Sequence, residues 1–439
     1  MMETTRPDWV LVTEGFILTM NPSAHDGKLR DLEIDASGLE SLGSILGGCV
    51  AVAGDRISYV GDIAGFESVH GPLSDHVVDH VGDRLVMPGL VDCHTHMAFA
   101  GSRQKEFLLR LRGASYMEIH RNGGGIGATT RAVRESSQGE LAEAILRRLD
   151  RHLENGVTTC EIKSGYGLST EHELMLLRAI ESAGKCHPVD VVSSFMGAHS
   201  IAPEFKDDPK GYIDLLTSEM IPEVARLGLA EFCDVFCEKG VFDPRQSLRI
   251  LMAAKGCGLG LKIHADEIVS YGGAELAAEV GAISAEHLLA ASDRGLKMMA
   301  SAGVTAALLP TTPLFLGKSN FAPARRMVEL GVPVAIATDF NPGSSTNQSL
   351  FLSMSIACLA MRMTPAEAIL GVTINGARAI GRERAVGHLS SGAQADILVL
   401  DVPDHLFLPY DLGGNRVSRV YKSGKSAYSS HRGIRGGSF

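Results

Sequence analysis

The sequence of 439 residues lacks long apolar runs and has few cysteines. Its longest weakly polar stretch, Leu42–Gly54, is too short and too rich in glycine to span a bilayer. The N-terminal residues, Met1–Pro7, lack the basic and apolar segments of a signal peptide. The eight cysteines do not form the paired spacing of a zinc knuckle, and several stand in apolar runs. These absences predict a cytoplasmic protein with reduced, buried thiols and no membrane partner.

Basic residues are too few for a protein whose main partner is nucleic acid. The chain has 41 Lys and Arg against 51 Asp and Glu, a formal charge of −10, and no Lys/Arg cluster. Binding to a phosphate backbone requires clustered positive charge, so this class of partner is excluded. Hydrophobic residues make up 45% of the chain, which is typical of a folded protein rather than a disordered one. An anionic substrate would have to be bound by a few well-placed cations.

Glycine-rich phosphate loops are also missing. Gly-Lys-Ser occurs at Gly317 and Gly424, but Thr312 and Arg419 stand where such a loop needs its first glycine. The three glycines at 123–125 follow no predicted strand, which indicates a tight loop before a helix that begins near Thr129. Both observations disfavour a nucleotide-binding fold.

The middle of the chain alternates apolar runs of strand length with amphipathic stretches of helical period. This alternation is typical of repeated βα units around a parallel sheet. Eight runs predict an α/β fold, a (β/α)8 barrel of TIM type with insertions, whereas a doubly wound sheet usually has fewer strands. The eight runs are Arg84–Asp92, Val157–Lys163, Val189–Met196, Glu231–Cys237, Gly258–Ile263, Ala282–Glu286, Gly303–Leu309 and Val332–Thr338. The helical stretches include Glu140–Glu154, Glu171–Ser182, Pro222–Leu227 and Pro244–Ala254.

Both ends of the chain have short strand-like runs separated by turns. These runs are Trp9–Met20, Cys49–Ala53, Arg56–Val60, Ala395–Leu400 and Arg416–Tyr421, the last followed by a turn at Ser423-Gly424. We expect the two ends to pair in one small β-sandwich domain. The predicted division is residues 1–85 with 376–439 for this domain, and 86–375 for the barrel.

Histidines and an aspartate stand where several predicted barrel strands end. His94 and His96 are two residues apart, so both imidazoles can face one ion. His264, His287 and Asp339 end three further strands. In a barrel of this type chemistry is located at the C-terminal strand ends. Imidazoles with one carboxylate suit zinc or non-haem iron, so we predict a metal site.

Other polar residues are predicted to share this mouth. Glu267 follows a predicted ligand by three residues and can move a proton, whereas Asp266 is expected to be a solvated loop carboxylate. Arg103 offers a bidentate fork for a substrate carboxylate. Further candidates for binding substrate are Tyr166, His199, Asn341, Gly343 and Ser344. Lys163 would bridge two metals only as a carbamate, and we favour one ion. The remaining histidines, among them His152 and His405, are predicted to lie on the surface.

Several motifs resemble a known family. Val86-Met87-Pro88-Gly89-Leu90-Val91-Asp92 before His94 resembles the entry to the catalytic domain of the amidohydrolase superfamily. Further motifs resemble its imidazolonepropionase family: Gly101-Ser102-Arg103, Gly113-Ala114-Ser115-Tyr116, Gly123-Gly124-Gly125-Ile126, Glu161 to Gly167, Gly197-Ala198-His199, His264-Ala265-Asp266, Ala337 to Gly343 and Gly413-Gly414-Asn415. The resemblance extends from about residue 84 to the C-terminal tail, and Asp31–Gly48 looks like an insertion.

The resemblance implies hydrolysis of a small anionic substrate, 4-imidazolone-5-propanoate, to N-formimidoyl-L-glutamate in histidine degradation. It implies one zinc or iron ion on His94, His96, His264 and Asp339, and a homodimer. It also implies substrate contacts from Arg103, Tyr166, His199, Glu267, Asn341, Gly343 and Ser344. Glu267 is expected to move the proton, and His287 to stabilise the oxyanion. Whether His287 is also a metal ligand stays open.

Two other functions fit parts of the pattern. A deaminase of a nucleobase or related ring would use the same ligands and Glu267, but a neutral base needs no carboxylate clamp such as Arg103. A non-catalytic scaffold of the same superfamily would have lost a ligand or the proton shuttle. This chain retains all of them.

Overall fold

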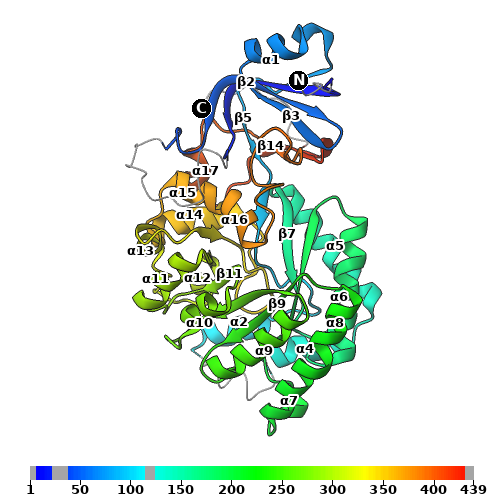
Figure 1. Ribbon diagram of the computed structural model, residues 1–439, viewed down its shortest axis with the longest axis vertical. Helices are drawn as coiled ribbons and strands as arrows, with labels where there is room; N and C mark the ends of the chain where they lie inside the picture. Colours follow the sequence, from blue (N-terminus) through cyan, green and yellow to red (C-terminus); the bar gives the residue numbers. More distant parts are fainter. Residues whose placement is uncertain (1–5, 22–37, 114–123, 431–439) are drawn as a thin grey trace.

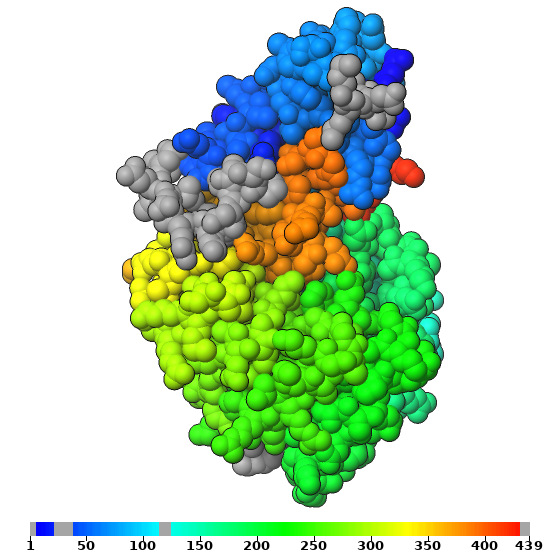
Figure 2. All heavy atoms as spheres, in the orientation of Figure 1, coloured from blue at the N-terminus to red at the C-terminus, as the bar shows by residue number. Residues whose placement is uncertain are grey.

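The computed structural model describes residues 6–21, 38–113 and 124–430. Its larger part is a parallel barrel surrounded by helices, and a separate sheet built from both termini lies at one end of the barrel (Figure 1). In the space-filling view the N-terminal segment and the stretch near residue 400 form one continuous body next to the barrel (Figure 2). The predicted fold class, a (β/α)8 barrel with a small β domain from both termini, is confirmed; the strands of that domain, expected as a β-sandwich, pair in one mixed sheet.

All eight predicted barrel strands are present. They pair in parallel in the order β13-β12-β11-β10-β9-β8-β7-β6. The strands are β6 (Leu90–Asp92), β7 (Val157–Lys163), β8 (Asp190–Ala198), β9 (Phe232–Cys237), β10 (Gly260–Ala265), β11 (Ser284–His287), β12 (Thr305–Leu308) and β13 (Val334–Ile336).

The barrel is closed by residues that carry the candidate metal ligands. A parallel bridge joins Thr95 to Phe340, just beyond β6 and β13. The backbone N–H of His96 donates to Phe340 O at 2.9 Å, and that of Asp339 donates to His94 O at 3.1 Å. The closure therefore places Asp339 next to His94 and His96, although it follows them by more than 240 residues in the chain.

The run Arg84–Asp92 was predicted to be one barrel strand, and this detail is wrong. The chain divides at Gly89 into β5 (Leu85–Pro88), which pairs with β14 in the terminal sheet, and β6 in the barrel. A Cβ on Gly89 would lie 2.1 Å from Oγ1 of Thr158, so only glycine allows this close crossing. The proposed domain limits, 1–85 with 376–439 and 86–375, stay a prediction.

The terminal sheet is mixed and has the strand order β16-β15-β14-β5-β1-β2-β3, with β4 beside β1. Leu11 and Val50 pack with Ile397 in one apolar cluster, whereas Val10 packs against Phe66 in another. The strands of both termini thus share one core, as predicted. They are β1 (Trp9–Leu18), β2 (Ser44–Ala53), β3 (Arg56–Gly61), β4 (Val78–His80), β14 (Ile397–Leu400), β15 (Val417–Lys422) and β16 (Lys425–Ser429). Ser423 and Gly424, with φ of 50° and 76°, make the predicted turn between β15 and β16.

The barrel helices begin at strong N-caps. Ser137 and Glu140 form a capping box that starts α5, and Asp243 with Gln246 forms another that starts α9. In α5 the apolar side chains recur at Leu141, Ile145 and Leu149, which are buried. No helix in the described ranges is both long and apolar enough to cross a membrane.

The helix bounds extend the predicted stretches by a few residues. The helices are α1 (Ile63–His70), η1 (Leu73–Asp75), α2 (Gln104–Leu111), α4 (Ile126–Arg134), α5 (Gln138–Glu154), α6 (Thr170–Cys186), η2 (Pro203–Phe205), α7 (Pro209–Leu215), η3 (Leu216–Met220), α8 (Ile221–Leu227), α9 (Pro244–Gly256), α10 (Gly273–Val280), α11 (Asp293–Ala302), α12 (Thr311–Phe315), α13 (Ala324–Glu329), α14 (Leu350–Met361), α15 (Pro365–Gly371), α16 (Ile374–Ala379) and α17 (Phe407–Tyr410). The helix after the three glycines begins at Ile126, earlier than predicted.

Most of the thiols are buried as predicted, but Cys186 and Cys257 are exposed. Cys93, Cys160, Cys233 and Cys237 are buried, and all eight cysteines are free. Parts of two predicted motifs, within residues 114–123, and part of the predicted insertion, residues 31–37, lie outside the described residues.

Candidate active site

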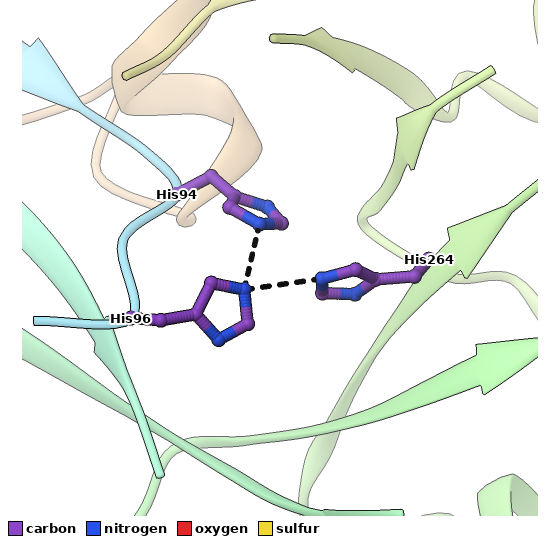
Figure 3. A group of neighbouring side chains, drawn as sticks. All are labelled: His94, His96 and His264. Carbon is purple, nitrogen blue, oxygen red and sulfur yellow. Dashed lines mark hydrogen bonds between the residues drawn. The ribbon is translucent and has the colours of Figure 1, made fainter. Parts of the chain in front are cut away.

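Three imidazoles from two segments converge at the C-terminal mouth of the barrel (Figure 3). Nε2 of His96 lies 3.2 Å from Nε2 of His94 and 3.2 Å from Nε2 of His264. Oδ1 of Asp339 lies 3.5 Å from Nε2 of His94 and 3.7 Å from Nε2 of His96. A tetrahedron with ligands about 2.1 Å from its centre has edges of about 3.4 Å. The four distances are close to the edge of such a tetrahedron, so the arrangement suits a single bound ion.

The histidines of this group are held in the form that binds metal. Burial lowers the pKa of His94 and His96 well below the usual value, and lowers that of His264 to about 3. All three rings are neutral at neutral pH, with lone pairs available for an ion. The donor set of three imidazoles and one carboxylate fits zinc or iron.

Asp339 is fixed by its surroundings. Burial raises its pKa to about 6, and Oγ1 of Thr312 donates to its Oδ2 at 2.5 Å. Its backbone has φ of 51°, a conformation that non-glycine residues rarely adopt. His287 also has positive φ, 69°, at the end of β11. Strained backbone of this kind is typical of functional sites.

Glu267 and His287 lie together beside this group. Nε2 of His287 is 3.7 Å from Oε2 of Glu267, and the side chains are largely buried. One ligand atom each of His287, His94 and Asp339 also lie within 4.8 Å of one another. The structure therefore brings both predicted catalytic residues next to the predicted metal ligands, while the roles of all these residues stay predictions.

Arg103 lies against the loop that follows Asp339. A Cβ on Gly343 would be 2.0 Å from Nη1 of Arg103, so the guanidinium packs directly on the glycine backbone. Nε and Nη2 of Arg103 contact Oε2 of Glu106 at 2.9 and 2.8 Å. Glu106 was missed in the sequence because it stands among the exposed polar residues of a short helix. Glu106 holds the guanidinium of Arg103 in place, with Nη1 directed towards Gly343.

Tyr166 and His199 form an aromatic wall beside His96. The rings of His96 and His199 are stacked with centroids 4.9 Å apart, and that of Tyr166 lies 5.3 Å from His199. The loop of Tyr166 is fixed by Glu173, whose buried carboxylate accepts from the backbone N–H groups of Gly165, Gly167 and Leu168. Glu173 was also missed, because its position within a helical pattern gave no functional signal.

The loop after Asp339 is held by hydrogen bonds among its own residues. Oδ1 of Asn341 accepts from the backbone N–H groups of Gly343 and Ser344, each at 2.8 Å. Nδ2 of Asn341 donates to Asp339 O at 2.6 Å and to Oγ of Ser344 at 2.9 Å. The side chain of Asn341 therefore shapes the loop, and its direct contact with substrate stays a prediction.

Two predictions about side-chain environment are wrong. Asp266 is fully buried, not solvated, and accepts from backbone N–H groups of residues 271–274 at the start of α10. His152 and His405 are buried, not on the surface. Nε2 of His152 lies 3.2 Å from Asp92, whose carboxylate also accepts from Oγ1 of Thr338, one residue before Asp339. The polar neighbours of His152 in the sequence gave no sign of this buried contact with Asp92.

Comparisons with known proteins identify relatives of this chain. The model of the amidohydrolase family matches residues 85–427. An imidazolonepropionase of Geobacillus kaustophilus is 56% identical over 80% of this chain and 82% of its own. Those of Shouchella clausii and Treponema denticola are 51% and 46% identical, over 88% and 86% of this chain and 87% and 91% of their own.

Solved structures share the fold at low identity. Guanine deaminase from E. coli matches with a TM-score of 0.66 and 16% identity, over 96% of this chain and 99% of its own. Adenosine deaminase from Xanthomonas campestris, with bound zinc, matches with a TM-score of 0.65 and 17% identity, over 96% and 93%. This likeness shows the fold alone, whereas the sequence relatives are much closer. The chain belongs to the amidohydrolase family and, within it, to the imidazolonepropionase family.

Proposed function

We propose that this site hydrolyses the ring C–N bond of 4-imidazolone-5-propanoate to give N-formimidoyl-L-glutamate, a step of histidine degradation. The convergence of four ligand atoms beside Glu267 carries the hydrolytic part of the proposal. The names of relatives 46–57% identical over most of the chain support the substrate.

One zinc or iron ion would be held by His94, His96, His264 and Asp339. When bound, such an ion polarises a carbonyl oxygen and lowers the pKa of water. The protein contributes neutral imidazoles, one carboxylate and the bond from Thr312 that keeps Asp339 in place.

Glu267 and His287 serve the proton and charge movements of the reaction. Glu267 accepts a proton from the attacking water and gives it to the ring nitrogen as the C–N bond breaks. The ring carbonyl carbon gains the water oxygen and becomes a carboxylate, so one molecule of water is consumed. His287 donates a hydrogen bond to the carbonyl oxygen as its negative charge develops.

Arg103 binds the propanoate arm of the substrate. Its guanidinium is fixed by Glu106 and presents Nη1 beside Gly343. Tyr166 and His199 form the wall on which the ring rests, and the loop of Asn341, Gly343 and Ser344 closes the other side. A neutral nucleobase would leave the charge of Arg103 without a partner in the substrate.

The test is turnover of freshly prepared imidazolone propanoate by purified protein, before and after metal removal. We expect formimidoylglutamate, loss of activity with a chelator, and recovery with zinc or iron. Loss of ammonia from a nucleobase without turnover of imidazolone propanoate would contradict the proposal.

Location and assembly are part of the same proposal. Eight free cysteines suit the reducing cytoplasm. A homodimer is expected, and light scattering coupled to size-exclusion chromatography measures it directly.

A further inference from the structure

Five charged side chains are buried together inside the barrel, beneath the metal ligands. Glu161 and Lys163 come from β7, Asp234 from β9, Lys262 from β10 and Glu286 from β11, and all are fully buried. Alternate residues of a strand share one face, so Lys262 lies one interior layer below the ligand that follows it on β10. The cluster therefore lies directly below the candidate metal ligands inside the barrel.

Two carboxylates of this cluster form, with His264, a second group that has the composition of a metal site. One ligand atom each of Asp234, His264 and Glu286 lie within 4.8 Å of one another. Ammonium groups are already at its oxygens: Nζ of Lys163 is 2.7 Å from Oδ2 of Asp234, and Nζ of Lys262 is 3.4 Å from Oε1 of Glu286. A divalent ion here would meet two positive charges in an interior where repulsion is poorly screened.

Glu161 joins the two ammonium groups. Its carboxylate lies 2.9 Å from Nζ of Lys163 and 2.8 Å from Nζ of Lys262. Burial opposes the charge of Lys163, but Asp234 and Glu161 raise the pKa of its amine above the usual value. Lys163 therefore stays an ammonium ion and does not supply the neutral amine that a bridging carbamate requires.

Asp234 links the cluster to the metal site. Its Oδ2 pairs with Lys163, and Nδ1 of His264 lies 3.0 Å from this oxygen and 3.1 Å from Oδ1, which also accepts from the backbone N–H of His264 at 3.2 Å. A hydrogen bond from Nδ1 fixes the ring and leaves the lone pair of Nε2 for the ion. The orientation of His264 thus depends on a carboxylate that Lys163 holds in place.

We propose that Lys163 and Asp234 are positioning residues for His264, and that the ammonium groups of Lys163 and Lys262 take the place of a second metal ion. This inference rests on the one-ion site proposed above and adds the residues that limit the site to one ion.

The first test is metal stoichiometry of the unaltered protein. Metal-free protein is incubated with excess zinc, desalted and analysed for metal and for turnover. We expect one ion per chain. Two tightly held ions in an active protein would overturn this inference while the proposed function stands. Protein that holds no ion would overturn both.

The second test measures zinc affinity by competition with a chromophoric chelator. Asp234→Asn and Lys163→Met should each weaken zinc affinity at least tenfold. Both act through the same bond to His264, so the double variant should bind zinc as tightly as the single variant with the lower affinity. Glu286→Gln is the matched control, since Glu286 is 3.7 Å from Nδ1 of His264, and it should change affinity less than threefold.

Unchanged affinity in Asp234→Asn, or additive losses in the double variant, would overturn the inference. Circular dichroism checks that each variant is folded. If Lys163→Met does not fold, the zinc affinities of Asp234→Asn and Glu286→Gln are compared instead, and they decide whether the inference stands.

Discussion

The guanidinium of Arg103 rests on the backbone of Gly343, where a Cβ would come within 2.0 Å of Nη1 and 2.5 Å of Cζ. The contact joins the segment after His96 to the loop after Asp339, so the proposed anion-binding group is fixed relative to two proposed metal ligands. It also explains why glycine stands at this position without a positive φ.

Gly343→Ala should displace Arg103 and mimic Arg103→Ala. We expect KM to rise about tenfold or more, because a hydrogen bond to a charged group contributes about 1.5–3 kcal/mol. Metal content should not change. Gly139→Ala is the control, since a Cβ there meets nothing within 4 Å. Steady-state kinetics with metal analysis measures both, and an unchanged KM in Gly343→Ala would show that the propanoate binds elsewhere.

Glu267→Gln should retain the ion and lose turnover. The amide keeps the shape of the side chain but cannot accept the proton, and general acid–base catalysis contributes about 10²–10⁴ to the rate. The measurement is kcat of the metal-loaded variant. A variant that stays active would mean that another group moves the proton.

Thr312→Val should weaken metal binding about tenfold, because Asp339 loses the hydrogen bond to its Oδ2. Thr305→Val is a matched control, since the buried Oγ1 of Thr305 has no hydrogen-bond partner among the described residues. Chelator competition compares the two variants. Equal affinities would show that Thr312 does not support the ligand.

His199 should make the protein less stable in mild acid. Burial lowers its pKa to about 4, below the usual 6.5, so the unfolded chain takes up a proton first. The stability from this difference is complete above pH 6.5 and is lost as the pH falls towards 4. At pH 5 the loss is about 2 kcal/mol. Urea unfolding at pH 7 and pH 5 should show a smaller difference for His199→Asn, and an equal difference would refute the assignment.

The sequence predicted the parts of the site that depend on local pattern. His94 and His96 could be placed by the two-residue period of an extended segment, and His264 and Asp339 by their position where apolar runs end. Thr312 could not be placed, because its bond to Asp339 crosses between segments that follow different strands. The division at Gly89 depends on its contact with Thr158, which no local pattern shows.

Charged residues inside the barrel were the main omission. Lys262 and Glu286 stand in apolar runs, so their charges within buried strands were a readable signal. Their meaning depends on partners from neighbouring strands, such as Asp234, that only the fold brings together. Asp266 and Glu267 are adjacent and chemically alike, yet one caps α10 and the other faces His287. The sequence alone could not separate the surroundings of the two carboxylates.

Hydrolysis of imidazolone propanoate in ¹⁸O-labelled water tests the central claim most directly. The account predicts a product heavier by one molecule of water, with the label in the carboxylate formed from the ring carbonyl, and formation that stops when the metal is removed. A product that has lost ammonia while keeping its ring, or an unlabelled product, would contradict the account.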